Sequence, residues 1–438
     1  MIQGPSLWGL IPLILFIVLV FKKWHPVAAI GLAVIVGAIM SGQSSISIAS
    51  SIKSGMGSFL TYVGLIILSG AGLGKITEKT GVARRVIHFV MYNIGINTPT
   101  KGILGTMISS TLLVSMLGTL AGANAIIAPV VIPIVASLGL SSSVVAIIFQ
   151  GAGACGLFLG PFTPPMVTLM KLTGLSYFQV LISAGIPVAI VLWVTTFFYA
   201  KKILPTSIKY DAYTENDLLG NSSKNKDDEK QNKFSLQATF AFLITLIGLI
   251  IYGIFIGGGS TFAIFVILTT AIVTGLVGRM NPNEISETFI DGTKPLVWLF
   301  FQFVLFTPFI QFSQDMGAFE ALKNLLLPLV TVGGQGLLIV IATLVGVVGI
   351  PGAAVAQSMV IDGMFKSLVT SMGVSMSVWV LVLLVGSQIT SFLYPEGDTL
   401  AAMGIARSKN IKNMVTFGVI ATIPQIILVI IRAFLIKG

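Results

Sequence analysis

Charged residues and metal-binding side chains are scarce in this sequence. Asp, Glu, Lys and Arg together make up 9% of the 438 residues, whereas a soluble domain carries about 25%. Two histidines and a single cysteine, Cys155, argue against a conventional zinc or haem site and leave no partner for an intrachain disulfide. A soluble enzyme and a nucleic-acid-binding protein are therefore not expected.

Apolar residues, in contrast, are abundant. Hydrophobic residues make up 55% of the chain and the mean hydropathy is +0.99. An apolar run of about 20 residues can cross a bilayer as an α-helix. The sequence therefore predicts an all-α integral membrane protein. Uninterrupted spans are expected at 7–22, 26–42, 56–74, 178–200, 235–256, 262–279, 293–313 and 413–436.

Four further apolar stretches are interrupted by Gly or Pro clusters. Residues 143–171 and 376–406 are expected to form two discontinuous helices, because proline removes N–H donors and stops helix propagation. Residues 102–138 and 335–372 are too long for one helix and too short for two spans, and each has a Gly-rich centre. We expect each of these two stretches to form a re-entrant helical hairpin.

A polar stretch divides the chain near its middle. Residues 203–233 combine acidic and basic residues without apolar periodicity, so they cannot build a core. We expect a linker at 203–233 that separates an N-terminal repeat, 1–202, from a C-terminal repeat, 234–438.

The two halves share sequence features in the same order. Pro161 corresponds to Pro395, and Gly55 to Gly292, at nearly the same separation. Each repeat is expected to contain five spans plus one re-entrant hairpin. An odd number of crossings inverts the second repeat relative to the first. The expected fold is therefore two inverted repeats with two discontinuous helices.

The basic residues indicate the orientation in the membrane. Lys and Arg exceed Asp and Glu by 25 to 15, and most of them share the side of the linker when the N-terminus is placed outside. Cytoplasmic loops are enriched in Lys and Arg. We expect a multi-pass protein of the plasma (inner) membrane with its N-terminus outside and the central linker cytoplasmic.

Inverted repeats with broken helices are typical of secondary transporters, which bind their substrate at the midplane. Helix N-termini there attract an anion, and freed carbonyl groups can bind a hard cation. The expected substrate-binding residues lie at the hairpin tips and helix breaks. They are Thr119, Gly122, Asn124, Thr163, Gly352, Gln357, Ser358 and Thr399. Close helix packing at Gly- and Ala-rich tips is the structural alternative.

Acidic groups inside spans are rare and usually functional. The residues expected to couple a cation are Asn124, Asp362, Glu396 and Asp398. An i,i+4 ion pair with Lys366 is an equal alternative for Asp362, and an exposed loop is the alternative for Glu396 and Asp398. Several glutamines within spans can line a cavity or form interhelical hydrogen bonds. These are Gln150, Gln302, Gln311, Gln314 and Gln388.

Three segments of the first half resemble the gluconate permeases: residues 51–58 (SIKSGMGS), 70–75 (GAGLGK) and 80–85 (TGVARR). These permeases belong to the ion transporter superfamily, beside citrate and dicarboxylate carriers and Na+/H+ antiporters. The resemblance implies a site formed by two opposed hairpins and two unwound helices, and it is compatible with a homodimer. Residues 160–165 lack the histidine of the gluconate permeases, so gluconate itself is not implied.

The sequence thus predicts a secondary transporter that moves a small organic anion, a monocarboxylate or a similar compound, coupled to H+ or Na+. A Na+/H+ antiporter without an organic substrate is the alternative. No cofactor other than the coupling ion is expected, and the partners are the anion and the lipid bilayer. An intramembrane enzyme lacks support, because no His-Glu-x-x-His motif occurs.

Cysteine labelling tests the orientation. In a Cys155→Ala background, the Ser223→Cys variant should react with an impermeant thiol reagent only after the membrane is permeabilised, because a cytoplasmic linker is shielded in intact cells. Labelling of intact cells would show that the orientation is the reverse.

Overall fold

The computed structural model describes residues 4–22, 24–93, 95–214, 228–256, 258, 262–349 and 354–435. Nearly all of these residues are helical, and the described part contains no strand beyond an isolated bridge between Ser141 and Ala212. Within it, nine helices are long and apolar enough to cross a membrane. The prediction of an all-α integral membrane fold is confirmed.

The first half follows the predicted spans closely, with ends that differ by a few residues. The structure adds two short helices, α3 and α5, that the apolar pattern does not reveal. The elements are η1 (Leu7–Leu10), α1 (Ile11–Phe21), α2 (Pro26–Ser41), α3 (Ser45–Met56), α4 (Phe59–Lys79), α5 (Val82–Asn93), α6 (Pro99–Leu117), α7 (Leu120–Ser137), α8 (Ser142–Leu159), α9 (Pro164–Thr173), α10 (Tyr177–Val180), the π-helical η2 (Leu181–Gly185) and α11 (Ile186–Ser207).

The second half repeats this order of elements. The short helix α15 has the place of α3, and the first part of α17 has the place of α5. The elements are α13 (Asp228–Phe255), α14 (Ala263–Val277), α15 (Pro282–Thr293), η5 (Lys294–Leu296), α16 (Val297–Asp315), α17 (Ala318–Leu344), η6 (Val345–Val348), α18 (Ala354–Ser371), α19 (Met376–Leu393), α20 (Gly397–Ala406) and α21 (Ile411–Leu435).

Both predicted stretches form helical hairpins, and their re-entrant character stays a prediction, since α6 and α7 are each long and apolar enough to cross a membrane. In the first, α6 and α7 pack against each other, and their bases meet where Leu138 lies beside Gly102. In the second, α17 bends at Gly334, whose φ of 66° and ψ of −166° are not helical. Its second part then packs against α18, and Gln335 Nε2 donates to Met372 O at 2.6 Å across the base.

Both predicted discontinuous helices are present as well. The first break separates α8 from α9 at residues 160–163, and the second separates α19 from α20 at residues 394–396. Gly160 and Tyr394 have extended backbone conformations where the helices end. The Pro residues at 161 and 395 account for these interruptions, because neither can donate to the preceding turn.

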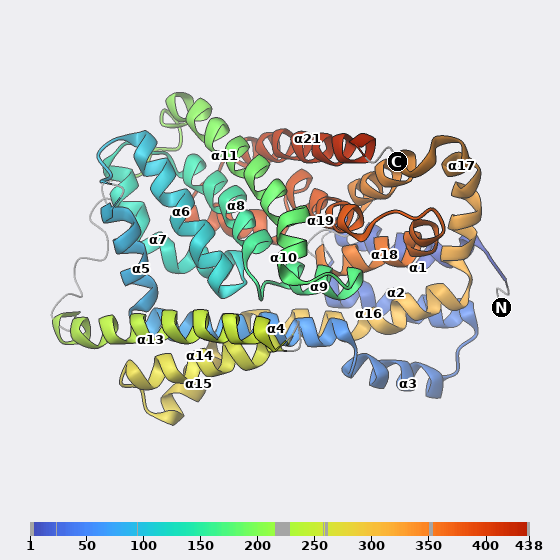
Figure 1. Ribbon diagram of the computed structural model, residues 1–438, viewed down its shortest axis with the longest axis horizontal. Helices are drawn as coiled ribbons and strands as arrows, with labels where there is room; N and C mark the ends of the chain where they lie inside the picture. Colours follow the sequence, from blue (N-terminus) through green and yellow to red (C-terminus); the bar gives the residue numbers. More distant parts are fainter. Residues whose placement is uncertain are drawn as a thin grey trace.

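The packing between helices recurs when the two halves are exchanged. Helix α2 packs against α16 as α14 packs against α4, and α7 packs against α20 as α18 packs against α9. In Figure 1 the hairpins and broken helices lie between a layer containing α4, α13 and α16 and a layer containing α11 and α21. This exchange is what two related repeats produce, while their inverted orientation and the domain boundaries stay predictions.

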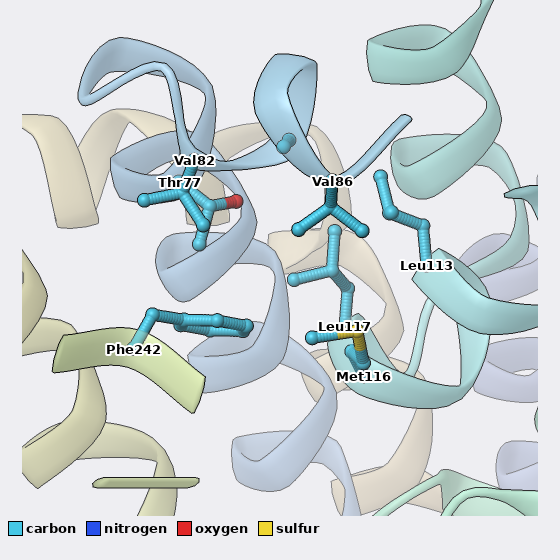
Figure 2. A pocket seen from close by; sticks show the side chains of 8 residues that line it. Thr77, Val82, Val86, Leu113, Met116, Leu117 and Phe242 are labelled. Atoms are coloured by element: carbon cyan, nitrogen blue, oxygen red, sulfur yellow. The ribbon is translucent and has the colours of Figure 1, made fainter. Parts of the chain in front are cut away.

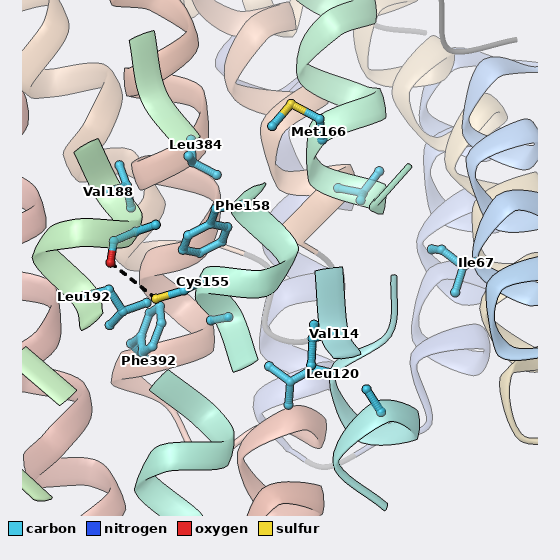
Figure 3. Packing of buried hydrophobic residues seen from close by; sticks show 14 of the residues in the cluster. Ile67, Val114, Leu120, Cys155, Phe158, Met166, Val188, Leu192, Leu384 and Phe392 are labelled. Atoms are coloured by element: carbon cyan, nitrogen blue, oxygen red, sulfur yellow. Dashed lines mark hydrogen bonds between the residues drawn. The ribbon is translucent and has the colours of Figure 1, made fainter. Parts of the chain in front are cut away.

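Broken helices α8 and α19 form the centre of the molecule. Their apolar spans are 89% and 83% buried, against 22% for the span in α13. Figure 3 shows Cys155 and Phe158 of α8 among side chains of α11 and α19. The Cys155 thiol donates to Ala189 O at 3.4 Å and packs as a small core residue. At the breaks themselves Gly160, Thr163 and Glu396 are buried, whereas Pro395 is exposed.

The first part of the predicted linker is packed against the helices. Asp211 Oδ2 accepts hydrogen bonds from Ser143 Oγ and from Ser408 Oγ, the latter at 2.8 Å. Ser142 N donates to Asp211 O at 2.9 Å. These contacts join the start of α8 to the loop after α20. The described part of 203–233 thus has fixed contacts that its polar composition does not predict.

Glycine spacing on α4 allows this helix to approach the first hairpin. A Cβ atom at Gly70 would lie 2.5 Å from Leu117 O, whereas one at Gly74 would lie 3.6 Å from Leu117 Cδ1. We expect Gly70→Ala to destabilise the protein by about 1–3 kcal/mol, because the backbone of α6 must move. Gly74→Ala, one turn further along, is the matched control and should be neutral or stabilising.

Melting temperatures of the two variants in detergent test this contact. Equal melting temperatures for Gly70→Ala and Gly74→Ala would contradict the close approach of α4 to the hairpin.

Candidate transport site

The tip of the first hairpin lies at the first helix break. Gly118 ends α6 in the left-handed conformation with φ 71°, which favours glycine. A Cβ atom there would lie 3.6 Å from Phe162 O and 3.7 Å from Thr163 Cα. The tip and the break thus form one continuous region.

The described end of the first arm of the second hairpin lies at the second break. The Tyr394 hydroxyl, where α19 ends, donates to Val347 O at 2.7 Å in η6. Gly349 follows η6 and contacts the side chain of Gln357 on α18. Gly352 and the rest of the tip of this hairpin, 350–353, lie outside the described residues.

Backbone carbonyl groups released at the first break accept hydrogen bonds from other parts of the protein. The Tyr177 hydroxyl donates to Leu159 O at 2.8 Å, and Thr163 Oγ1 lies 2.9 Å from Gly160 O and 2.6 Å from Leu157 O. Burying such a carbonyl without a donor would cost several kcal/mol. Protein groups therefore satisfy these three carbonyl groups without an ion.

The carbonyl of Ser391, in the last turn of α19, has two donors. Gln150 Nε2 on α8 lies 3.0 Å from it, and Thr399 Oγ1 on α20 lies 3.3 Å from it. The Gln150 bond joins the two halves of the chain. The sequence pattern identifies Gln150 as a polar residue within an apolar run. It does not identify the partner of Gln150, because Ser391 is remote in sequence.

Three helices begin at these breaks and tips without a side-chain cap. Thr119, Thr163 and Glu396 occupy the N-cap positions of α7, α9 and α20, and none of their side chains caps its helix. In contrast, Thr98 and Ser141 do cap α6 and α8. An uncapped N-terminus with free N–H groups carries partial positive charge and attracts anions. Of these three, only α7 has this character, because α9 begins with Pro164 and Pro165, which have no N–H, and α20 has the acidic residues Glu396 and Asp398 at its start. The site therefore has carbonyl groups with protein donors and one helix N-terminus that can attract an anion.

Glu396 is the most unusual side chain of the site. It is 7% exposed, and neither carboxylate oxygen makes a well-aligned hydrogen bond among the described residues, although the Ser391 hydroxyl and the N–H groups of Gly397 and Asp398 lie beside it. Asp398, two residues later, is half-buried in the first turn of α20. Glu396 thus lies inside the protein and not in an exposed loop. A carboxylate in this setting is costly unless a cation neutralises it.

Asn124 is fully buried and holds the first hairpin against α8. Its Oδ1 accepts from Ser110 Oγ at 2.7 Å, and its Nδ2 donates to Phe149 O at 2.9 Å. Gly122 lies two residues before Asn124. A Cβ atom at this position would lie 2.6 Å from the Thr119 hydroxyl oxygen. The proposed ligand role of Asn124 stays a prediction, and the contacts present are structural.

Asp362 forms the ion pair that its sequence spacing allows. Its Oδ1 accepts from Lys366 Nζ at 3.2 Å and from Trp379 Nε1 at 2.6 Å. Lys366 Nζ also donates to Leu172 O of α9 at 2.6 Å. This network joins the second hairpin to both broken helices. The coupling role of Asp362 stays untested.

Ser358 and Gln357 lie buried on α18, one turn into the second hairpin's descending arm. Ser358 Oγ donates to Val355 O at 2.7 Å within its own helix.

Figure 2 shows a separate pocket between α4, α5, α6 and α13, in which Thr77 is the only polar side chain among the lining residues. The Thr77 hydroxyl donates to Gly74 O at 2.8 Å. This pocket therefore has no group suited to a carboxylate.

The comparisons with known proteins agree with this architecture. Residues 14–289, more than half of the chain, match the family model described as citrate transporter (CitMHS). The chain therefore belongs to the citrate transporter family, a family of membrane carriers. It is a secondary transporter of the multi-pass membrane type and not an enzyme. The finer resemblance to gluconate permeases is not confirmed.

Two solved structures share the fold. MtrF of Neisseria gonorrhoeae, described with a class of antimetabolite efflux pumps, is 15% identical with a TM-score of 0.66, covering 95% of this chain and 96% of its own. The YdaH transporter of Alcanivorax borkumensis is 12% identical with a TM-score of 0.51, covering 89% of both chains. No curated protein matches the chain in sequence.

The environment of Asn124 generates a stability prediction. Asn124→Ala removes the donor to Phe149 O and the acceptor of Ser110, so it should destabilise the protein by about 1–3 kcal/mol. The measurement is the melting temperature in detergent. Asn413→Ala is the control, because it removes only an exposed bond to the Tyr210 hydroxyl.

The opposite pattern would assign Asn124 to the ligand. That pattern is an unchanged melting temperature together with a roughly 10- to 150-fold weaker substrate affinity, the loss expected for a hydrogen bond to a charged group.

Proposed function

We propose that the protein moves a small organic anion across the plasma membrane, coupled to H+ or Na+. The observation that carries this proposal is the asymmetry of the site. Carbonyl groups at its breaks accept hydrogen bonds from protein side chains, whereas the N-terminus of α7, at the first hairpin tip, has no side-chain cap. Such a site attracts a carboxylate more strongly than a bare cation.

Membership of the citrate transporter family supports a carboxylate substrate. The positive charge of Lys366, on the second hairpin, is already engaged by Asp362 and by Leu172 O. Helix dipoles and backbone N–H groups therefore carry the recognition, which favours a small carboxylate. The uncapped N-terminus of α7 also favours this function over a Na+/H+ antiporter without an organic substrate.

The coupling cation is assigned to the second break. Glu396 is buried without a well-aligned hydrogen bond in the described structure, and its charge must be neutralised for the closed site to persist. Binding of the cation there would neutralise the carboxylate while the anion occupies the N-terminus of α7. The N-terminus is assigned to the outside and the linker to the cytoplasm, as the distribution of basic residues predicts.

Reconstituted vesicles test this function. Purified protein in liposomes should accumulate radiolabelled citrate or a small monocarboxylate when a proton or sodium gradient is imposed, and should exchange it in counterflow without a gradient. Sodium-dependent proton movement without uptake of any organic acid would support the antiporter and overturn the proposal.

A charge-neutralising variant separates coupling from binding. Glu396→Gln should abolish gradient-driven accumulation and retain counterflow exchange, because the anion site stays intact while the cation site is lost. Glu78→Gln is the control, since Glu78 is half-exposed at the end of α4 and pairs with Lys75. Accumulation at the wild-type level by Glu396→Gln would remove this carboxylate from the mechanism.

A further inference from the structure

Two sets of acceptor atoms without a well-aligned hydrogen bond occur around the last turn of α19. Gln150 Oε1 and both oxygens of Glu396 are buried and make no such bond in the described part of the chain. Gln150 reaches this turn from α8 through its bond to Ser391 O, and Glu396 follows the turn by a few residues. Acceptors cannot bond to one another unless one of them carries a proton.

Few titratable groups surround Glu396. Helix α20 packs against α7, α8 and α19. Neither α7 nor α19 contains an ionisable side chain, and α8 contains only Cys155, whose thiol donates to Gly151 O and Ala189 O. The one charged neighbour on α20 itself is Asp398. No basic side chain on these elements compensates Glu396, so a bound cation must do so.

The available ligands fit a proton better than a sodium ion. A hard cation prefers about six oxygen ligands. The Ser391 carbonyl already accepts from Gln150 Nε2 and Thr399 Oγ1, so neither of its lone pairs is available. The described residues also contain no group of three acidic, His or Cys side chains that could hold a metal ion. A proton, in contrast, requires only one acceptor.

We propose that Glu396 and Gln150 form a proton-coupling pair across the two halves of the transporter. The protonated Glu396 carboxyl donates to Gln150 Oε1, while Gln150 Nε2 stays on Ser391 O. Gln150 is thus a positioning residue. When the proton is lost to water, the charged Glu396 carboxylate faces the amide oxygen of Gln150. The two oxygens repel each other, and this repulsion favours opening of the site. This inference names the coupling ion of the proposed function and rests on it.

Infrared spectroscopy of the purified protein tests the pair without any transport assay. At neutral pH the wild type should show the C=O band of a protonated carboxylic acid, and Glu396→Gln should lose that band. Gln150→Met, which keeps the side-chain volume, should shift the band to higher frequency because the carboxyl loses its acceptor. It should also move the pH at which half of the band is lost to a lower value by about one unit, because the protonated form loses its acceptor. This shift is a tenfold increase in the proton dissociation constant.

Gln425→Met is the matched control. Gln425 is also a buried glutamine, 2% exposed, but its Nε2 donates to Ala421 O within its own helix at 2.9 Å. This variant should leave the frequency and the midpoint of the band unchanged. An equal shift in both variants would reduce the role of Gln150 to packing and overturn the pair.

Sodium provides an independent arm on the wild type. Replacing KCl by NaCl at constant ionic strength should leave the carboxylic acid band unchanged. Loss of the band in NaCl alone would assign sodium to Glu396 and overturn the proton, even if Gln150→Met fails to fold. Failure of organic acid uptake with an intact, Gln150-dependent band would instead overturn the proposed substrate and leave the pair standing.

Discussion

The cost of unpaired backbone groups at membrane depth constrains the whole structure. Two helices stop and restart inside the protein, and each interruption releases carbonyl and N–H groups that lipid cannot satisfy. Tyr177, Thr163 and Gln150 supply donors to carbonyl groups at the breaks. The most buried spans, α8 and α19, are those that end at the breaks. The surrounding helices and hairpins therefore bury the helices that lead into these interruptions.

The two breaks share a backbone arrangement but differ in chemistry. The first contains Phe162 and Thr163 between prolines, whereas the second contains Glu396 and Asp398. Each hairpin contacts both broken helices, since α7 packs on α20 and α18 packs on α9. A repeat of this kind provides the same scaffold twice. The differing side chains then allow one break to serve a neutral or anionic ligand and the other a cation.

Hydrogen bonds between distant segments connect these parts. Gln150 joins α8 to α19, Lys366 joins the second hairpin to α9, and Asp211 joins the start of α8 to the loop after α20. A movement of either hairpin would therefore alter contacts in both halves. Such shared contacts are what a carrier needs if occupation of one break is to influence the other.

The sequence by itself determined the spans, both hairpins and both breaks, because apolar length and Pro or Gly clusters act locally. It also marked Glu396 as an acidic group in an apolar setting, and it did not reveal the short helices α3, α5 and α15. Only the tertiary structure decided that Asn124 turns to Ser110 and Phe149, and that Gln150 reaches Ser391. Those partners depend on how helices far apart in sequence pack, and apolar periodicity does not specify the partner of a buried polar side chain.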